Sequence, residues 1–435
     1  MSTRPPQVSG AIEASIPYRK IALRIMPILC ACYVAAYIDR TNIGFAKLGF
    51  THDLAFTETV YGLGAGLFYL GYVTCEIPSN LYMARVGMRR TLVRIMLLWS
   101  GSCAALALMQ SPAQYYALRI LLGAAEAGLA PGVFLYLTYW IPAARRARFT
   151  ALFMASVPIA GVIGGPLAGV FMGGLDGWLG IPGWRWLLLI EGMLGLPLAA
   201  LAFRTLTDRP INAHWLSENE RSAILKQFAA DAQLAPASHA TFGEVLRDAR
   251  FYLLVGLGFG IMTSMGGLFF WLPTIIRRAG VESVLDVGLL AMVPFAIAIA
   301  VQYIVAVHSD RVGERRWHAV LSAFAAALGW GLAATSGTSV IWSVVFLTLA
   351  AAGTSAATGI FWALPGLMLR DRASPGGIAL VTSLAGFGNL VSPPLVGWLA
   401  DRTGTLAAGQ VYFGLLMAIG GLMLLAGTAG RSTAA

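Results

Sequence analysis

Residues 85–90 read Arg-Val-Gly-Met-Arg-Arg, and residues 311–316 read Arg-Val-Gly-Glu-Arg-Arg, at an offset of 226 positions. A second pair of segments has nearly the same offset, because Gly-Pro-Leu-Ala-Gly at 165–169 is followed 228 positions later by Pro-Pro-Leu-Val-Gly at 393–397. Two unrelated signatures that agree on one offset indicate an internal repeat of about half the chain. The sequence therefore predicts two similar halves.

The composition is typical of a membrane protein. Of the 435 residues, 58% are hydrophobic and 11% are charged, whereas a soluble domain is about half apolar and about a quarter charged. This excludes a water-soluble enzyme, a disordered scaffold and a disulfide-stapled secreted module. The four cysteines lie inside apolar stretches and the five histidines form no cluster, so we expect no metal site, no cofactor and no catalytic residue.

Twelve apolar blocks are long enough to cross a bilayer as helices, which requires about 20 residues each. They lie at 21–45, 58–83, 91–110, 113–139, 149–173, 184–203, 250–276, 286–308, 317–336, 340–369, 376–400 and 408–428. We expect an all-α membrane protein with two six-helix halves. Its predicted segments are an N-terminal tail at 1–20, a first bundle at 21–204, a linker at 205–248, a second bundle at 249–428 and a C-terminal tail at 429–435.

The basic residues predict the orientation of these spans. Of the 30 Lys and Arg, 21 lie in the tails, the linker and the gaps on the same side, and 5 lie in the gaps on the opposite side. The positive-inside bias therefore places both termini in the cytoplasm. Basic residues scattered between apolar blocks explain the net charge of +10 without nucleic acid, so we expect the lipid bilayer as partner. The ratio of 27 Arg to 3 Lys favours a bacterial inner membrane.

Five further segments carry a resemblance to a known family. They are Tyr-Ile-Asp-Arg-Thr-Asn-Ile-Gly at 37–44, Glu-Ile-Pro-Ser-Asn at 76–80, Gly-Ala-Ala-Glu-Ala-Gly at 123–128, Tyr-Trp-Ile-Pro at 139–142 and Phe-Trp-Ala-Leu-Pro at 361–365. With the repeated turns, the chain resembles the major facilitator superfamily and, more narrowly, its anion:cation symporter family, over nearly its whole length. The resemblance implies proton coupling at the positions of Asp39 and Glu126, with Arg119 beside the acid. It also implies substrate contacts at the positions of Tyr37, Arg40 and Tyr72.

Ionisable residues inside the spans are costly, so each is a functional hypothesis by default. Arg40 is the candidate carboxylate clamp, because a guanidinium stays charged and binds a carboxylate with two parallel hydrogen bonds. Asp39 lies about 100° round the helix from Arg40, so one should face a cavity and the other a neighbouring helix. Arg119 and Glu126 are seven residues apart on one helix face, where they could also neutralise each other. The remaining residues of this kind are Arg24, Glu76, Arg94 and Glu191.

The second half offers neutral side chains in place of charges. We expect Trp362 and Asn389 to close the site from that half. The family often has an asparagine seven residues before the position of Pro393, and this chain has Gly386 there, so the role of Asn389 stays open. The glycines at 62, 64 and 66 and at 161 and 165 are expected to permit close helix packing, since no strand or P-loop accompanies them.

The repeated basic turn suggests a gate at the ends of the helices. Arg85 and Arg311 carry positive charge where two helices meet the cytoplasm, which topology alone could also explain. Asp310 could accept hydrogen bonds from a neighbouring helix N-terminus or an Arg and form an interlock. Its counterpart in the first half is Ala84, so the interlock should be one-sided.

These observations favour a proton-coupled symporter that imports a small organic carboxylate by alternating access, acts as a monomer and uses protons as coupling ion. The alternative is a proton-driven exporter of drugs or metabolites. A receptor or an enzyme would need either a larger soluble portion or a cluster of catalytic residues, and the sequence predicts neither. Glu76 and Arg94 are expected to pair across the second and third spans, and no role follows for Glu191.

Overall fold

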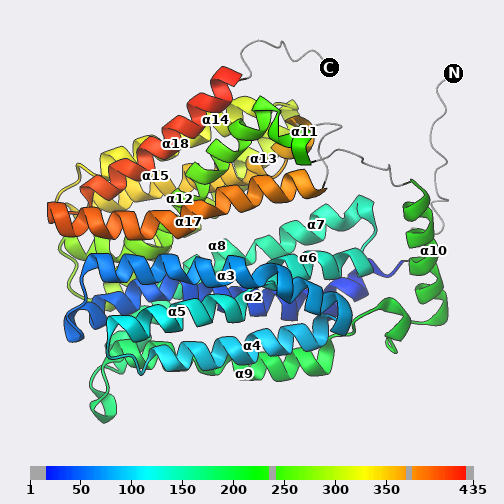
Figure 1. Cartoon of the computed structure of the whole chain (residues 1–435), viewed down its shortest axis with the longest axis horizontal. Coiled ribbons are helices and arrows are strands. Elements are labelled where there is room, and N and C mark those ends of the chain that lie inside the picture. Colours follow the sequence, from blue (N-terminus) through cyan, green and yellow to red (C-terminus); the bar gives the residue numbers. More distant parts are fainter. Residues whose placement is uncertain (1–15, 235–241, 369–374, 428–435) are drawn as a thin grey trace.

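A computed structural model of the chain describes residues 16–234, 242–368 and 375–427. Residues 1–15 and 429–435 of the two predicted tails therefore lie outside the described residues. The described secondary structure is helical, with two groups of long helices stacked on each other (Figure 1). The all-helical architecture predicted from the apolar blocks is confirmed for these residues.

The first group of helices follows the first six predicted spans. It consists of α2 (Tyr18–Asp53), α3 (Glu58–Val86), α4 (Met88–Leu106), α5 (Pro112–Glu126), α6 (Leu129–Trp140), α7 (Ala143–Met154), α8 (Ser156–Gly174) and α9 (Gly183–Thr205). The fourth predicted span is interrupted because Gly128 adopts a left-handed conformation with φ 86° between α5 and α6. The first helix continues to Asp53, eight residues beyond the predicted end.

The remaining helices form the linker and the second group. The linker contains α10 (Glu218–Leu234) and α11 (Phe242–Leu246), and the second group consists of α12 (Ala249–Arg278), α13 (Val284–Val312), α14 (Arg316–Ala333), α15 (Val340–Phe361), α16 (Leu364–Met368), α17 (Pro375–Thr403) and α18 (Ala407–Gly427). In Figure 1, α10 lies at the right end of the molecule. We call this the linker end and the opposite end the far end.

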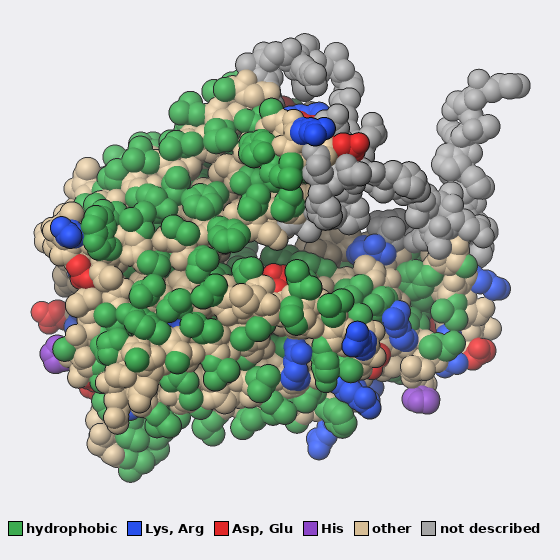
Figure 2. Space-filling model, in the orientation of Figure 1, with side chains coloured by type: hydrophobic (Ala, Val, Ile, Leu, Met, Phe, Trp, Pro, Cys, Tyr) green, Lys and Arg blue, Asp and Glu red, His purple; other side chains and the backbone are tan. Residues whose placement is uncertain are grey.

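Ten of the described helices, counting α5 with α6 and α7 with α8 as one each, are long and apolar enough to cross a membrane. The third and ninth predicted blocks form α4 and α14, of 19 and 18 residues, which begin with charged turns containing Arg89, Arg90 and Arg316. Apolar side chains cover much of the face shown in Figure 2. Ile77 and Ile341, for example, are 71% and 74% exposed. Such a surface is suited to lipid rather than to water.

Contacts between the two groups follow the internal repeat. Helix α8 packs on α13, and α17 packs on α3, so the fifth predicted span of each half meets the second span of the other. Helices α2 and α12, the first spans of the two halves, also contact each other. This exchange of equivalent helices is the arrangement expected when two similar halves face each other around an approximate two-fold axis.

Glycines permit these contacts, as the sequence predicted. A Cβ at Gly62 would lie 2.2 Å from the Pro393 carbonyl oxygen, and a Cβ at Gly165 would lie 2.6 Å from the Gly288 carbonyl oxygen. Both distances are far below van der Waals contact, so the backbones of the two halves approach each other where no side chain could be accommodated. The packing role of the predicted glycines is confirmed. The contacts of Gly62, Gly66, Gly161 and Gly165 are between the halves, whereas Gly64 packs on Tyr115 within the first half.

The repeated basic turns are also glycine turns. Gly87 between α3 and α4 has φ 91°, and Gly313 between α13 and α14 has φ 70°. These left-handed conformations favour glycine because it has no Cβ. The repeat therefore reflects a shared backbone requirement at the linker end of both halves, in addition to its positive charge.

Candidate functional site

The candidate site is centred on Arg40, which α2 places inside the first half. The Arg40 side chain is 6% exposed, and its Nη2 donates a hydrogen bond to Oε1 of Glu126 at the end of α5. The guanidinium carbon lies 4.6 Å from the ring centre of Tyr37, 5.1 Å from that of Phe68 and 5.1 Å from that of Tyr72. A permanent cation is thus enclosed by three aromatic faces and one carboxylate.

The Arg40 site retains unused hydrogen-bonding capacity. Among the described residues, Nε of Arg40 and Oε2 of Glu126 are buried without a hydrogen-bond partner. Buried polar groups in folded proteins are nearly always paired, so the orphan donor and the orphan acceptor are unusual. An anion entering beside Arg40 would meet a free donor on a charged side chain.

Local sequence explains how Glu126 reaches Arg40. A Cβ at Gly123 would lie 1.9 Å from the Phe68 carbonyl oxygen, and a Cβ at Gly71 would lie 2.1 Å from that of Ile120, so α3 and α5 pack backbone to backbone. Helix α5 then ends at Glu126, two residues before the left-handed Gly128. The Gly-x-x-Glu-x-Gly pattern therefore brings α5 close to α3 and places the carboxyl group at the break between two helices.

Asp39 and Arg40 point to different neighbours, as their angular separation predicted. Asp39 is 1% exposed and accepts a hydrogen bond from Sγ of Cys103 on α4 at 3.1 Å, whereas Arg40 turns toward α3 and α5. The side chain of Asp39 therefore lies between packed helices and is separated from Glu126 by the backbone of α2.

Arg119 does not hydrogen-bond to Glu126 and acts on it only through a longer-range electrostatic interaction. Nε of Arg119 donates to the Gly64 carbonyl oxygen at 3.3 Å, and its guanidinium lies 4.8 Å from the ring centre of Phe68. Nη1 and Nη2 of Arg119 are buried without a partner among the described residues. The ring of Phe68 thus contacts both arginines, Arg40 and Arg119, and Glu126 pairs with the first.

Among the described residues, neither Trp362 nor Asn389 forms a hydrogen bond or ring contact with Arg40, and their part in closing the site stays a prediction. Trp362 follows the last residue of α15, is 48% exposed and contacts the ring of Phe361 in its own half. Asn389 on α17 lies against Gly266 of α12, where a Cβ would be 2.9 Å from Oδ1 of Asn389. The second half contacts α2 close to Arg40 through Tyr37, three residues earlier in the sequence. The ring centre of Tyr37 lies 5.8 Å from that of Phe269 on α12.

Sequence reasoning missed a set of charged residues that joins the two halves at the far end. Glu58 of α3 forms ion pairs with Lys47 of α2 and, at 2.7 Å, with Arg278 of α12. Asp401 of α17 accepts hydrogen bonds from the backbone N–H groups of Glu58 at 3.0 Å and Thr59 at 2.8 Å. We call Lys47, Glu58, Arg278 and Asp401 the far-end lock. Opposite charges at the ends of spans that lie on the same side were the signal in the sequence.

Of the predicted gate residues, Asp310 accepts a hydrogen bond from an arginine, which was one of its two predicted partners. Asp310 pairs at 3.1 Å with Arg315 of its own turn, and its side chain is 69% exposed, so it does not reach a neighbouring half. Arg85 and Arg311 are exposed at the linker end. The first half also has an acidic cap, because Asp208 after α9 accepts a hydrogen bond from the Arg89 backbone N–H at 2.8 Å. The prediction that an interlock at Asp310 is one-sided stays a prediction.

Glu76 and Arg94 do not pair with each other, contrary to expectation. Nη2 of Arg94 donates to Oγ of Ser79, and its guanidinium lies 4.9 Å from the ring centre of Tyr82. The sequence indicated which helices neighbour each other, but Ser79 is closer to Arg94 than Glu76 is because it lies nearly one turn further along α3.

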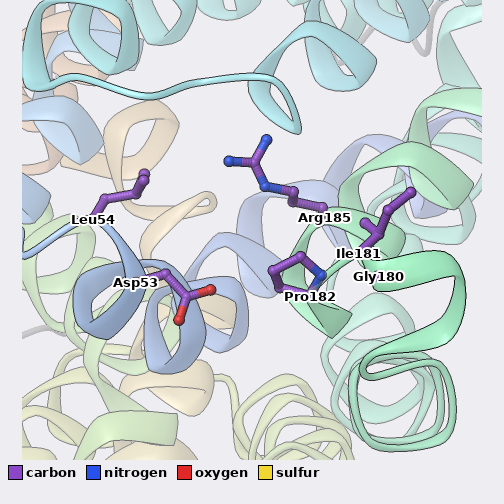
Figure 3. A pocket seen from close by; sticks show the side chains of 6 residues that line it. All are labelled: Asp53, Leu54, Gly180, Ile181, Pro182 and Arg185. Carbon is purple, nitrogen blue, oxygen red and sulfur yellow. The ribbon is translucent and has the colours of Figure 1, made fainter.

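Two pockets at the ends of the molecule lie away from Arg40. The first, of about 600 Å³ and shown in Figure 3, is lined by Asp53, Leu54, Gly180, Ile181, Pro182 and Arg185 at the far end. Its two charged side chains already have hydrogen-bond partners. Asp53 accepts a hydrogen bond from Nε1 of Trp184 at 2.7 Å, and Arg185 donates one to the Ala107 carbonyl oxygen at 2.6 Å. The second, of about 640 Å³, lies at the linker end and includes Arg24, Arg89 and Arg204. Neither contains the aromatic enclosure of Arg40.

Two repeated groups of membrane-length helices, with an arginine buried inside the first, are typical of a membrane transporter of small molecules. The family comparison agrees with this class, since residues 29–373 match the model of the Major Facilitator Superfamily. The chain belongs to this superfamily. Its membership makes the chain a multi-pass transporter and not an enzyme.

Individual relatives indicate which members of the superfamily the chain resembles. The chain is 41% identical over 408 residues, 94% of its length and 93% of the relative's, to a provisionally named tartrate transporter of Agrobacterium vitis. It is 40% identical over 401 residues, 92% of each chain, to the provisionally named metabolite transport protein NicT of Pseudomonas putida. It is also 36% identical over 405 residues, 92% of each chain, to a quinolone resistance transporter of Acinetobacter baumannii. The resemblance to anion:cation symporter-like members is thereby confirmed.

Solved structures confirm the fold. A bacterial homolog of the human lysosomal transporter Spinster, in an inward-facing and occupied conformation, superimposes with a TM-score of 0.74 at 17% identity, covering 96% of this chain and 99% of that chain. The xylose transporter XylE from Escherichia coli, in a partially occluded inward-open conformation, gives a TM-score of 0.69 at 14% identity, covering 94% of this chain and 99% of that chain. At these identities the likeness concerns the fold alone.

Proposed function

We propose that the chain is a proton-coupled symporter that imports a small organic carboxylate by alternating access. The observation that carries the proposal is the buried Arg40 guanidinium, which has one carboxylate partner, three aromatic neighbours and a donor left over. A guanidinium in a low-dielectric site binds a carboxylate strongly and with defined geometry. Aromatic walls favour a planar or partly apolar body on that carboxylate.

The ion pair between Arg40 and Glu126 supplies a coupling mechanism. A substrate carboxylate that binds Arg40 competes with Glu126 for the same guanidinium. Once displaced, the Glu126 carboxylate is buried without its cation, and burial favours its protonated form. Substrate and proton are then loaded together, because each removes the electrostatic cost of the other. Release of the substrate returns Glu126 to Arg40 and expels the proton.

Alternating access requires that the two ends of the molecule open in turn. We propose twelve membrane spans with both termini in the cytoplasm of a bacterium, which places the linker end inside and the far end outside the inner membrane. The far-end lock closes the outer entrance in this conformation, and its ion pairs separate when the transporter opens outward. Arg85, Asp310 and Arg311 at the linker end take part in closing the inner entrance in the outward-open state.

The names of the relatives support a carboxylate substrate and also provide a second candidate. Tartrate is a small organic dianion, and it is the named substrate of one relative. A relative associated with quinolone resistance favours export of a drug-like molecule as the alternative. An exporter of cations needs an acid that is free of a neighbouring arginine at the site, whereas Glu126 is bound to Arg40. Carboxylate import therefore remains the preferred function.

Reconstituted protein in liposomes tests the proposal. An inward proton gradient should drive accumulation of a labelled carboxylate from a panel that includes tartrate, and a protonophore should abolish it. Arg40→Ala should abolish uptake, whereas Arg19→Ala, an exposed arginine on the same helix, should leave it unchanged. Glu126→Gln should keep substrate exchange across the membrane and lose gradient-driven accumulation. Full accumulation by Arg40→Ala, or outward movement of a panel compound driven by the gradient, would contradict the proposal.

A further inference from the structure

A second group of buried ionisable side chains lies on another side of α2 from Arg40. Asp39 of α2, Cys103 of α4 and Glu191 of α9 each place an oxygen or sulfur atom within 4.8 Å of the other two. Their exposed fractions are 1%, 0% and 2%. The function proposed above leaves Glu191 without a role, although burying a carboxyl group of this kind is costly.

The hydrogen bonds of the two carboxyl groups are incomplete. Oδ1 of Asp39 accepts from Cys103 at 3.1 Å, and Oε1 of Glu191 accepts from Nδ2 of Asn42. Oδ2 of Asp39 and Oε2 of Glu191 have no hydrogen-bond partner among the described residues. Two ionised carboxylates can only accept, but a single added hydrogen turns one of them into a donor to the other. One proton therefore satisfies both orphan atoms.

A charge count over the same region also requires one proton. The interior formed by α2, α4, α5 and α9 contains three carboxyl groups and two guanidinium groups that are at least nine-tenths buried, namely Asp39, Glu126, Glu191, Arg40 and Arg119. The buried ammonium group of Lys47 on α2 is left out of this count because it is neutralised by Glu58 at the far end. An unpaired charge in such surroundings is unfavourable by several kcal/mol or more, so the group neutralises instead. With two permanent cations against three acids, one acid is protonated.

The neighbours of each acid indicate which one this is. Glu126 is bound to Arg40, and Asp39 lies within electrostatic range of both Arg119 and Arg40. The groups that act on Glu191 are Asp39 and the amide of Asn42, and neither is a cation. Around the pair, Cys103 and Trp99 of α4 and the Leu188 carbonyl of α9 complete the surroundings of Asp39 and of the thiol. We propose that Glu191 and Asp39 share one proton in the empty protein and form a second proton-binding site.

The pair is linked to the substrate site through Arg119, which acts electrostatically on both Asp39 and Glu126. This step rests on the proposed function. When Glu126 takes up a proton on substrate binding, Arg119 loses one anionic neighbour and stabilises ionised Asp39 more strongly. The O–H bond at the pair then breaks as a new O–H bond forms at Glu126, and the pair takes up a replacement proton from the solvent, so that one proton is loaded with each substrate. The pair therefore exchanges its proton during the transport cycle.

A proton fits this group better than a metal ion. Hard cations take six or more oxygen ligands, whereas this group offers carboxylate oxygens from two side chains and a thiol, which is a poor ligand for them. The thiol donates its hydrogen to Asp39 and also lies 3.3 Å from the Leu188 carbonyl oxygen, which is the geometry of a neutral thiol. A bound sodium ion remains a separate outcome that the experiment distinguishes.

Infrared spectroscopy of the full chain in lipid nanodiscs detects the proton directly. At neutral pH the wild type should show the carbonyl stretch of a protonated carboxylic acid, and Glu191→Gln should lose it. Asp39→Asn should keep the band at a shifted frequency, because Glu191 then donates to an amide. Glu76→Gln, a half-buried acid on α3, should leave the band unchanged. A wild type without the band, a band that survives in Glu191→Gln, or sodium binding that Glu191→Gln abolishes would overturn the proposal.

Transport then tests whether the proton is used. In liposomes, Glu191→Gln should retain substrate exchange and lose proton-driven accumulation. Full accumulation by this isosteric variant would show that the proton is only structural and would overturn the coupling step. If the wild type itself accumulates no carboxylate, the proposed function fails, and the infrared result still decides the shared proton independently.

Discussion

Removing the charge of Glu58 should open the far end of the protein. Glu58→Gln deletes the ion pairs to Lys47 and Arg278 but preserves the size of the side chain. The Arg278 guanidinium is 39% exposed, so its pair contributes little, on the order of 0–1 kcal/mol. Lys47 is 2% exposed, and breaking a buried pair by removing one partner costs about 3–5 kcal/mol. The closed far end should therefore lose about 3 kcal/mol relative to the open state, in which Lys47 is hydrated.

A difference of this size changes the ratio of the two states by roughly a hundredfold. Part of the loss is offset, because the Lys47 ammonium keeps its hydrogen bond to Thr274 at 3.0 Å and lies 4.3 Å from the ring centre of Trp271. Even a tenfold change would convert a minor outward-open population into one that spectroscopy detects. The perturbation thus acts on the equilibrium between conformations and leaves the Arg40 site intact.

The distance between two spin labels, measured by electron paramagnetic resonance, reports whether the far end has opened. Labels at His52 and Thr405 report on the far ends of the two halves, where both residues are exposed. Glu58→Gln should add or enlarge a long-distance population, whereas Glu282→Gln, an exposed acid at the same end, should leave the distribution unchanged. Identical distributions for wild type and Glu58→Gln would refute the reasoning that the lock holds the far end closed.

Three further predictions concern the site, the packing and the linker. Arg40→Lys keeps the charge but loses the guanidinium fork, so KM should rise roughly tenfold to a hundredfold in uptake assays, for a loss of about 1.5–3 kcal/mol. Gly123→Ala places a Cβ 1.9 Å from a backbone carbonyl of α3 and should lower Tm by roughly 2–10 °C in thermal unfolding, whereas Gly101→Ala, with no atom within 4 Å, should not. The hydrogen bond from Lys20 lowers the pKa of Glu220, so their contact persists above the ordinary carboxyl range and is lost as pH falls below it. The protection of the α10 amides against hydrogen exchange, relative to the intrinsic exchange rate at each pH, should therefore fall on acidification, and Glu220→Gln should show the reduced protection already at neutral pH.

The spans could be predicted from the sequence because each depends on local composition. An apolar block of sufficient length must satisfy its backbone internally in lipid, which leaves helix as the solution. The close-packing glycines were predictable for a similar reason, since clusters such as Gly161 and Gly165 have few other uses inside a span. The different directions of Asp39 and Arg40 followed from helix geometry alone.

The partners across helices could not be predicted in the same way. Glu126 does not pair with Arg119 because the two lie about two turns, roughly 10 Å, apart along α5. That it meets Arg40 on α2 depends on how α5 packs on α3 through the close contact at Gly123. Helical periodicity tells which residues share a face, but it does not tell which neighbour that face meets. The same limit applies to Arg94, which binds Ser79 although Glu76 offered the opposite charge.

The far-end lock was missed for a different reason. Its members come from α2, α3, α12 and α17, and Glu58 and Asp401 are 343 positions apart in the sequence. Each of them lies near the end of a predicted span, where a single charge is usually explained by the membrane surface. Only the superposition of the two repeats, which pairs the second span of one half with the fifth of the other, brings these charges to one place.

The distribution of charge between the halves suggests a division of labour in the transport cycle. The buried arginines and acids near mid-span belong to the first half, whereas the polar interior of the second half is built from neutral hydrogen bonds, such as Ser264 to Thr354 at 2.7 Å and Trp330 to Ser264 at 2.7 Å. Neutral networks do not change charge when a proton or an anion binds. We propose that the first half carries both binding and coupling, and that the second half closes over it and selects by shape. Substitutions that line the second half should alter which carboxylates are accepted and leave the dependence on the proton gradient intact.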